Sequence, residues 1–260
     1  MKKIALQLYS LREFLTADPI GTLKKVHDMG YDGVEWPGVG EKAPEDLEKI
    51  TSNAGLEFFS VHITADDILT CNLALLRQYA AAGCQFLPIG WLPEERRAGG
   101  SLFFQTCDAI QRYATAAKAE GLYVMYHNHE FDLEPIFQNG CRQLDLLYDL
   151  LPSSLLGAEL DTCWLYTGGV DPAEYIRKYA DRSPIVHLKD CVKEGGRAGF
   201  CPIGSGVLDF SGIWDACENA RWLCVEQDEA TPGLDAFQCA QASIQALKQL
   251  EAEKLNSINK

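Results

Sequence analysis

The sequence predicts an α/β fold, a single (β/α)8 TIM barrel that forms one domain over residues 1–260. Three observations favour this fold. A strand-like apolar run followed by an amphipathic helix recurs eight times along the chain. Glycines end several of the helices just before the next strand, as C-cap glycines do. The 260 residues and the apolar share of 47% suit one barrel with a sizeable core.

In the first half of the chain, the predicted helices end at glycines. The strands are expected at 3–9, 31–36, 56–62 and 84–89. The helices are expected at 18–29, 44–54, 70–82 and 101–120. The glycines at their ends are Gly30, Gly55, Gly83 and Gly121. An Asp18-Pro19 pair marks the start of the first helix, with proline in the first turn.

In the second half, capping residues mark the helix starts. The strands are expected at 122–129, 155–161, 184–189 and 222–226. The helices are expected at 140–151, 172–180, 209–219 and 234–251. Asp171-Pro172 and Asp209 offer caps for two of these helices. The Gly204-Ser205-Gly206 segment after the seventh strand is expected to be a plain loop, because a short G-x-G is weak evidence for phosphate binding.

The chain is strongly acidic, with a formal net charge of -14 and a pI of about 4.8. Such a surface repels phosphodiester backbones and anionic membranes. No apolar run approaches the ~18 residues of a membrane span. We therefore expect no nucleic-acid partner and no membrane association, and the sequence leaves a homo-oligomer open.

The ten cysteines form no C-x-x-C pair, and several lie in apolar runs. The N-terminal residues lack the apolar stretch and small-residue cleavage site of a signal peptide. We expect reduced thiols that act as small core residues, and a cytoplasmic protein. A zinc ribbon is not supported.

Polar side chains of the kinds that bind metals follow five of the predicted strands. Because the carboxyl ends of the strands meet at one face of a barrel, side chains far apart in sequence are expected to converge there. Buried imidazoles and carboxylates are costly unless they are paired or bound to a metal. The pattern predicts an enzyme with a divalent metal site. The segments that carry it are Ser60–His62, Tyr126–His129, Glu159–Asp161, Val186–Lys189 and Val225–Asp228.

Three of these side chains are candidate metal ligands from separate strands. Asp161 is a hard oxygen ligand for Mn²⁺, Mg²⁺, Co²⁺ or Zn²⁺. His187 offers a neutral imidazole, which suits a transition metal. Glu226 is expected to act as ligand, as base, or as both. The alternatives are a turn cap for Asp161 and a satisfied core imidazole for His187.

The fifth strand carries two histidines, His127 and His129, which share a face because they are two residues apart. We expect this face to point inward, so that both approach one ion, or one binds it while the other handles a proton. In the alternative, Asn128 faces the site and the histidines are structural.

Lys189 lies on the same face as His187 and is expected to anchor a hydroxyl or polarise a carbonyl; an ion pair with Asp190 or Asp228 is the alternative. Schiff-base chemistry is disfavoured, since a metal already supplies the electrophile. Further residues at the strand ends are expected to hold or stack on a sugar: Gln7, Tyr9, Glu35, His62 and Trp164.

Together these segments resemble the xylose-isomerase-like TIM-barrel superfamily, whose members are commonly known as sugar phosphate isomerases/epimerases. The similarity extends over almost the whole chain and its motifs are specific to the superfamily, but they do not specify a substrate. The segments that carry it are Leu6–Arg12, Tyr31–Glu35, Tyr126–Phe131, Glu159–Asp161, Val186–Asp190 and Val225–Asp228.

The resemblance implies a divalent ion, often Mn²⁺, with Mg²⁺, Co²⁺ or Zn²⁺ as alternatives. Asp161, His187 and Glu226 match the family's ligands on strands six to eight. Strand five departs from the better-known epimerases, which have a glutamate there, and we assign His129 as its ligand. Whether a histidine replaces the ligand, the acid/base or both stays open.

The resulting hypothesis is proton abstraction next to the carbonyl of a sugar or keto-sugar, through an enediolate, by an isomerase or epimerase. The expected catalytic residues are Glu226, His127, His129 and Lys189, one histidine having a pKa near neutrality. The alternatives are a lyase, a dehydratase or a 3-keto-glycoside-cleaving enzyme with the same first step. A DNA hydrolase is disfavoured by the acidic charge, and a non-catalytic sugar-binding protein is less favoured.

Overall fold

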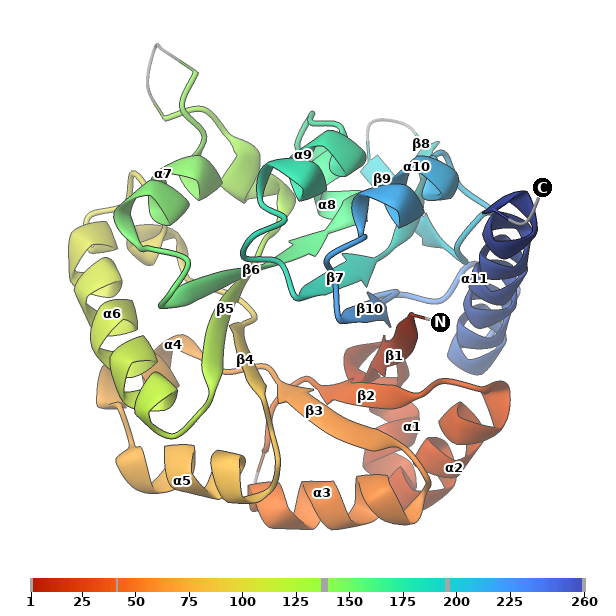
Figure 1. Cartoon of the computed structure of the whole chain (residues 1–260), viewed down its shortest axis with the longest axis horizontal. Helices are drawn as coiled ribbons and strands as arrows, with labels where there is room; N and C mark the ends of the chain where they lie inside the picture. Colours follow the sequence, from red (N-terminus) through yellow and green to blue (C-terminus); the bar gives the residue numbers. More distant parts are fainter. Residues whose placement is uncertain (1, 41, 137–139, 195–196, 259–260) are drawn as a thin grey trace.

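Eight parallel strands close into a barrel, as the sequence predicts, in the spatial order β1-β10-β7-β6-β5-β4-β3-β2 (Figure 1). The computed structural model describes residues 2–40, 42–136, 140–194 and 197–258. The barrel strands are β1 Lys3–Gln7, β2 Gly33–Trp36, β3 Glu57–Val61, β4 Phe86–Ile89, β5 Tyr123–His127, β6 Leu156–Asp161, β7 Ile185–Leu188 and β10 Trp222–Val225.

Helices surround the barrel (Figure 1). They are α1 Arg12–Ala17, α2 Pro19–Met29, α3 Pro44–Asn53, α4 Ala65–Thr70, α5 Leu73–Ala81, α6 Phe103–Ala119, α7 Gln143–Leu150, α8 Thr162–Thr167, α9 Pro172–Lys178, α10 Phe210–Ala216 and α11 Ala236–Ile258. Short 3-10 turns are η1 Leu8–Leu11, η2 Glu94–Arg96 and η3 Glu130–Leu133. The four predicted helix-ending glycines all have positive φ, between 80° and 95°, which confirms their capping role.

The structure differs from the prediction in several elements. The helix expected over 70–82 begins only at Leu73, as α5, because Cys71 adopts a left-handed φ of 46° and Asn72 caps the start of α5; a separate helix, α4, ends just before it at Thr70. The strands expected over 3–9 and 122–129 end early, at Gln7 and His127, where η1 and η3 follow closely. The segment between β7 and α10, where no strand was predicted, contains an antiparallel hairpin, β8 Asp190–Glu194 and β9 Arg197–Cys201. The Gly204-Ser205-Gly206 segment after the hairpin forms neither helix nor strand, as expected.

The interior of the barrel is apolar at one end and polar at the other. The apolar end holds Phe59 stacked on Trp222, with ring centroids 4.0 Å apart, and their neighbours. Since alternate residues of a strand face the same side, the next inward-facing residue of each strand lies two positions closer to its carboxyl end. In this way Met125, Ile185 and Cys224 of the apolar cluster precede the buried polar residues His127, His187 and Glu226.

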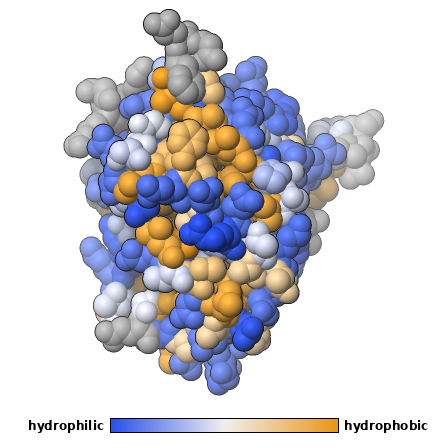
Figure 2. Space-filling model, turned by 90° about the vertical axis from the view of Figure 1, so that its left-hand side faces the viewer, coloured by the Kyte–Doolittle hydropathy of each residue, from blue (hydrophilic) through white to orange (hydrophobic). Residues whose placement is uncertain are grey.

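The face of the molecule on the side of α6 carries apolar residues among hydrophilic ones (Figure 2). Phe104 of α6 is 70% exposed, which is normal for a single surface side chain. Among the described residues, no helix combines the length and the apolar character that crossing a membrane requires. No disulfide bond forms between the ten cysteines, all of which are described.

Gly157 of β6 has no side chain, so Tyr123 and Met125 can pack closely against its backbone inside the barrel. Replacing Gly157 tests this packing. A Cβ atom there would lie 2.6 Å from Tyr123 Cε1 and 2.9 Å from Met125 Cγ. We expect Gly157→Val to lower the free energy of unfolding by about 1–3 kcal/mol, because the barrel would be overpacked. Urea denaturation measures this. The exposed helix substitution Thr115→Val should change stability by less than about 0.5 kcal/mol, and equal urea midpoints for both variants would contradict the packing.

Candidate active site

A cavity with a volume of about 670 Å³ opens at the carboxyl ends of the barrel strands. It is larger than two other cavities on the described residues, which have volumes of about 450 and 430 Å³. Its wall contains seven of the predicted site residues. They are Tyr9, His62, His127, His129, Trp164, Lys189 and Glu226.

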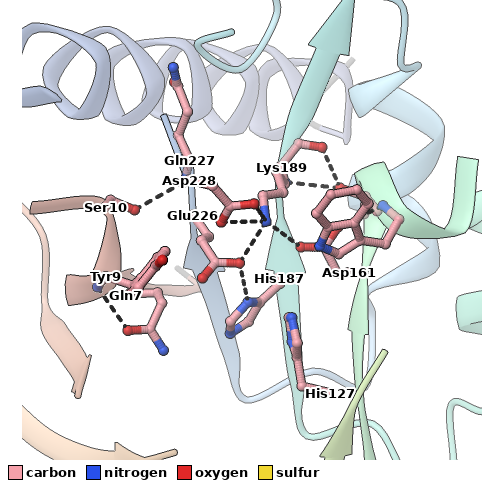
Figure 3. Close-up of polar contacts among 12 residues, drawn as sticks. Gln7, Tyr9, Ser10, His127, Asp161, His187, Lys189, Glu226, Gln227 and Asp228 are labelled. Carbon is pink, nitrogen blue, oxygen red and sulfur yellow. Dashed lines mark hydrogen bonds and ion pairs between the residues drawn. The ribbon is translucent and has the colours of Figure 1, made fainter. Parts of the chain in front are cut away.

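Four buried side chains from four strands meet beneath this cavity. Their ligand atoms all lie within 4.8 Å of one another. Figure 3 shows three of them close to Lys189, and His127 beside His187. His187 Nδ1 lies 3.3 Å from Glu226 Oε2. We call this set the four-residue group: His127, Asp161, His187 and Glu226.

Lys189 is fully buried beside this group and is surrounded by carboxylates. Its Nζ lies 2.9 Å from Glu226 Oε2, 2.8 Å from Asp228 Oδ2 and 3.5 Å from Asp161 Oδ2 (Figure 3). Burial alone would lower the pKa of Lys189, but these carboxylates outweigh it and raise the pKa above its ordinary value. The ammonium form is therefore strongly favoured, which agrees with a charged anchor and not with a Schiff-base amine.

The side of His187 that faces away from Glu226 is held by a second buried network. Its Nε2 lies 2.7 Å from Glu35 Oε1, and Glu35 also accepts hydrogen bonds from Gln7 Nε2 at 2.7 Å and Ser60 Oγ at 2.5 Å. Burial lowers the pKa of His187, but Glu159 and Glu35 outweigh it and hold the pKa well above its ordinary value. A carboxylate on the far nitrogen of a histidine is the arrangement that orients metal-ligating imidazoles.

Gln7 and Glu35 therefore lie below the cavity and not in its wall. Both are fully buried, and neither is among the residues that line the cavity. Their polar atoms are already paired within the protein: Gln7 donates to Glu35 and accepts from Tyr9 N at 3.1 Å, while Glu35 also contacts Ser60, His62 and His187. The structure brings them to the site as residues that position His187, and not where a substrate hydroxyl would reach them.

The four-residue group has the chemistry of a divalent metal site. Two imidazoles and two carboxylates form a mixed N/O ligand set, which suits Mn²⁺, Co²⁺ or Zn²⁺. Two buried atoms of the group, His127 Nδ1 and Asp161 Oδ2, make no hydrogen bond among the described residues, and their nearest charged neighbours are Glu159 Oε2 at 3.3 Å and Lys189 Nζ at 3.5 Å. Buried polar atoms of this kind are costly unless a ligand satisfies them. The residues present therefore fit a metal ion.

Two further sets of buried side chains also have metal-ligand spacing. One of them shares two histidines with the four-residue group and consists of His62, His127, Glu159 and His187. The other is Glu35, His187 and Cys224. In the first set, His62 Nε2 already lies 2.9 Å from Glu159 Oε2, and in the second His187 is bonded to Glu35. The four-residue group differs in lying next to the cavity and Lys189.

The two histidines of strand five have different positions. β5 ends at His127, which points into the barrel, and the chain then turns into η3. His129 lies in the cavity wall, where its ring stacks on Phe131 with centroids 5.1 Å apart. The side chain between them, Asn128, accepts a hydrogen bond from Asp161 N at 3.0 Å. The structure thus brings His127, and not the expected ligand His129, into the four-residue group.

Neither histidine titrates near neutrality, contrary to what the sequence suggested for an acid/base. Burial lowers the pKa of His129 to about 3, with a further contribution from Lys189. Burial also lowers the pKa of His127 well below its ordinary value, together with the charge of His187. Both rings are therefore neutral, the form in which an imidazole binds a metal or accepts a proton.

Two residues of the site are absent from the sequence-based selection. Ser60 donates a hydrogen bond to Glu35. It lies two residues before His62, and this strand spacing is the sequence feature that could have identified it as a residue of the site. Phe200 lies in the hairpin that the sequence did not predict. It lines the cavity, and its ring centroid is 5.2 Å from Lys189 Nζ and 5.5 Å from that of Trp164.

A closed parallel barrel with buried ligand-type side chains below a cavity at its strand ends defines the class of α/β-barrel enzymes. The chain belongs to the xylose isomerase-like TIM barrel family, whose model matches residues 23–250. Comparisons with individual proteins agree with this family. The inosose dehydratase of Geobacillus kaustophilus is 26% identical over 202 residues, which are 69% of this chain and 64% of that protein.

Among solved structures, a sugar phosphate isomerase/epimerase from Parabacteroides distasonis is 25% identical, with a TM-score of 0.79 over 95% of this chain and 98% of that chain. The IOLI protein with a binding zinc atom is 13% identical, with a TM-score of 0.67 over 97% and 99% of the two chains, and shows the shared fold. The matches to inosose dehydratases span 46% to 64% of the length of those proteins.

Metal binding should stabilise the fold through the four-residue group. At an Mn²⁺ concentration of about 100 times Kd, the chelator-treated protein should gain about 2.7 kcal/mol, which raises Tm by roughly 5–10 °C for a chain of this size. Differential scanning calorimetry measures the shift. Asp161→Asn should remove most of it, whereas Asp228→Asn, which changes a carboxylate outside the group, should keep it. A shift that survives in Asp161→Asn would place the ion elsewhere.

Proposed function

We propose that this chain is a divalent-metal-dependent isomerase or epimerase that moves a proton next to the carbonyl of a sugar or keto-sugar. The family implies a carbohydrate as the small-molecule substrate. The observation that carries the proposal is the four-residue group at the bottom of the cavity, with the Lys189 ammonium 2.9 Å from Glu226. Metal-ligand spacing, a buried cation and an open cavity coincide at this one place.

In this proposal His127, Asp161, His187 and Glu226 hold the ion. We expect Mn²⁺, with Mg²⁺, Co²⁺ or Zn²⁺ as alternatives. A bound divalent ion would supply electrophilic stabilisation for the negative charge that develops on substrate oxygens when the proton leaves. Glu35 fixes the orientation of the His187 ring from behind.

The proton-handling groups follow from charge and position. Although burial raises the pKa of Glu226, Lys189 and His187 bring it well below its ordinary value, so the side chain is a carboxylate that can accept a proton. His129 is a neutral imidazole in the cavity wall; burial lowers its pKa to about 3, so it suits a hydrogen-bond acceptor for a substrate hydroxyl better than a general base. The Lys189 ammonium offers a hydrogen bond to a substrate oxygen. Trp164, His62 and Tyr9 line the space for the sugar.

A second candidate function is dehydration, because the matched curated relatives are inosose dehydratases. Elimination begins with the same proton abstraction, and the hydroxyl on the next carbon then leaves as water. The pair of Glu226 and Lys189 suits this outcome: the carboxylate takes the proton from the carbon and passes it to the departing hydroxyl, which leaves as water, while the ammonium stabilises the departing oxygen. A 3-keto-glycoside would lose an alcohol in the same way.

Hydrogen exchange in D₂O tests the shared first step. With metal-loaded protein and a panel of keto-sugars, inososes and 3-keto-glycosides, deuterium should enter the carbon next to the carbonyl, and a chelator should abolish the exchange. Recovery of an isomer by NMR identifies an isomerase or epimerase, and a conjugated product seen by ultraviolet absorbance identifies a dehydratase or lyase.

Glu226→Gln should lower kcat by about 10²–10⁴-fold, since it removes the proton acceptor and weakens the metal site. The matched control is Glu229→Gln, which alters an exposed glutamate of the same cavity wall and should leave kcat within a few fold. Retained turnover in Glu226→Gln would contradict the proposal. Absence of exchange with every substrate at saturating metal would favour a sugar-binding role without catalysis.

A further inference from the structure

The charge of the cavity wall restricts the ligands that this site can take. Among its described residues, four carboxylates stand against one ammonium: Asp66, Glu226, Asp228, Glu229 and Lys189. The ammonium is already paired with Glu226 and Asp228 at 2.9 Å and 2.8 Å. Away from the four-residue group and the ion that it would hold, a phosphate or carboxylate on the ligand would meet the exposed carboxylates of Asp66 and Glu229. The other cation-forming side chain of the wall, His62, is paired with Glu159 at 2.9 Å and with Glu35 at 3.0 Å.

The backbone amides near the cavity do not replace the missing cation. Helix α4 begins in the cavity wall, at Thr64 and Ala65. Two of the amides at its start are already matched within the chain, because Asp67 Oδ2 accepts from Thr64 N at 2.7 Å and Thr64 Oγ1 accepts from Asp67 N at 3.2 Å. Asp66 in the same turn adds another negative charge. An anionic group on the ligand is therefore disfavoured at this end of the cavity too.

The cavity also presents aromatic side chains at two levels. The inner pair is Trp164 and Phe200, which meet edge to face around Lys189. The outer rings are Tyr9 and Trp91, which are 43% and 52% exposed although both line the cavity. Aromatic rings bind the apolar faces of sugars and other rings.

Arginines hold both exposed rings in place. Arg12 lies 4.3 Å from the Tyr9 ring centroid and donates to the Asp228 carbonyl at 2.6 Å. Arg97 lies 5.1 Å from the Trp91 centroid and donates to the Leu92 carbonyl at 2.7 Å. Rings fixed by cation–π contacts and backbone hydrogen bonds form a rigid surface that loses little entropy when a ligand stacks on it.

From these observations we infer that the site takes an uncharged carbohydrate with two rings. The hydroxylated ring lies between the four-residue group and Trp164, and the second ring lies against Tyr9 and Trp91 at the mouth. The volume of about 670 Å³ lies within the range of about 300–1,000 Å³ of sites for drug-sized ligands. The inference deepens the proposed function, on which it rests for the placement of the sugar ring. The second ring is an aromatic group or a second sugar.

Binding of unreactive probes to the metal-loaded protein tests the inference by isothermal titration calorimetry. The two-ring probes are methyl β-cellobioside and phenyl β-glycosides of glucose, galactose and mannose; the reference probes are the corresponding methyl glycosides and methyl glucoside 6-phosphate. At least one two-ring probe should bind about 3- to 10-fold tighter than its one-ring reference, and methyl glucoside 6-phosphate should bind at least about tenfold more weakly than methyl glucoside. Methyl β-cellobioside and the phenyl glycosides distinguish the two kinds of second ring.

Trp91→Ala should remove the preference for two-ring probes and leave binding of the methyl glycosides unchanged. The control Phe104→Ala removes an exposed ring of α6 outside the cavity and should change neither. The inference is overturned by tighter binding of methyl glucoside 6-phosphate than of methyl glucoside, by equal loss of one-ring and two-ring binding in Trp91→Ala, or by absence of binding of all two-ring probes. Because these probes carry no carbonyl to react, a protein that prefers them but shows no D₂O exchange would refute the proposed chemistry alone.

Discussion

The candidate site depends on one buried hydrogen bond, between His187 Nε2 and Glu35 Oε1 at 2.7 Å. Because Glu35 occupies the Nε2 side of the ring, Nδ1 faces Glu226 at 3.3 Å. A buried carboxylate without partners would destabilise the fold by several kcal/mol, and Gln7 and Ser60 offset this by donating to Glu35. Strands β1, β2 and β3 thus fix the four-residue group although they supply none of its members. A bound ion would replace the proton on Nδ1, so that metal binding and protonation of His187 compete.

The alternation of side chains along each strand explains why chemistry is confined to one end of the barrel. Inward positions hold Met125, Ile185 and Cys224 near the closed end, and His127, His187 and Glu226 one step further along the same strands. The apolar residues exclude water from below, while the cavity admits ligands from above. Electrostatic interactions are therefore strong at the polar end, as the opposed pKa shifts of Glu226 and Lys189 indicate.

The sequence predicts the barrel and the strands that carry the site because both depend on local periodicity and on capping glycines. It does not predict where β5 ends. His127 and His129 share a face only while the strand continues, and the turn at Glu130 separates them. Nor does it reveal that Gln7 and Glu35 bond to each other and to His187, since this follows from the register between strands. The hairpin that carries Phe200 depends on pairing between short segments that lack a clear periodic pattern.

The central claim is that one divalent ion is held by His127, Asp161, His187 and Glu226. Anomalous X-ray diffraction from crystals of the Mn²⁺-loaded protein tests this most directly. We expect one strong anomalous peak within about 2.0–2.3 Å of a ligand atom from each of the four side chains. A peak bound by His129 in place of His127, or one centred between His62 and Glu159, would contradict the account.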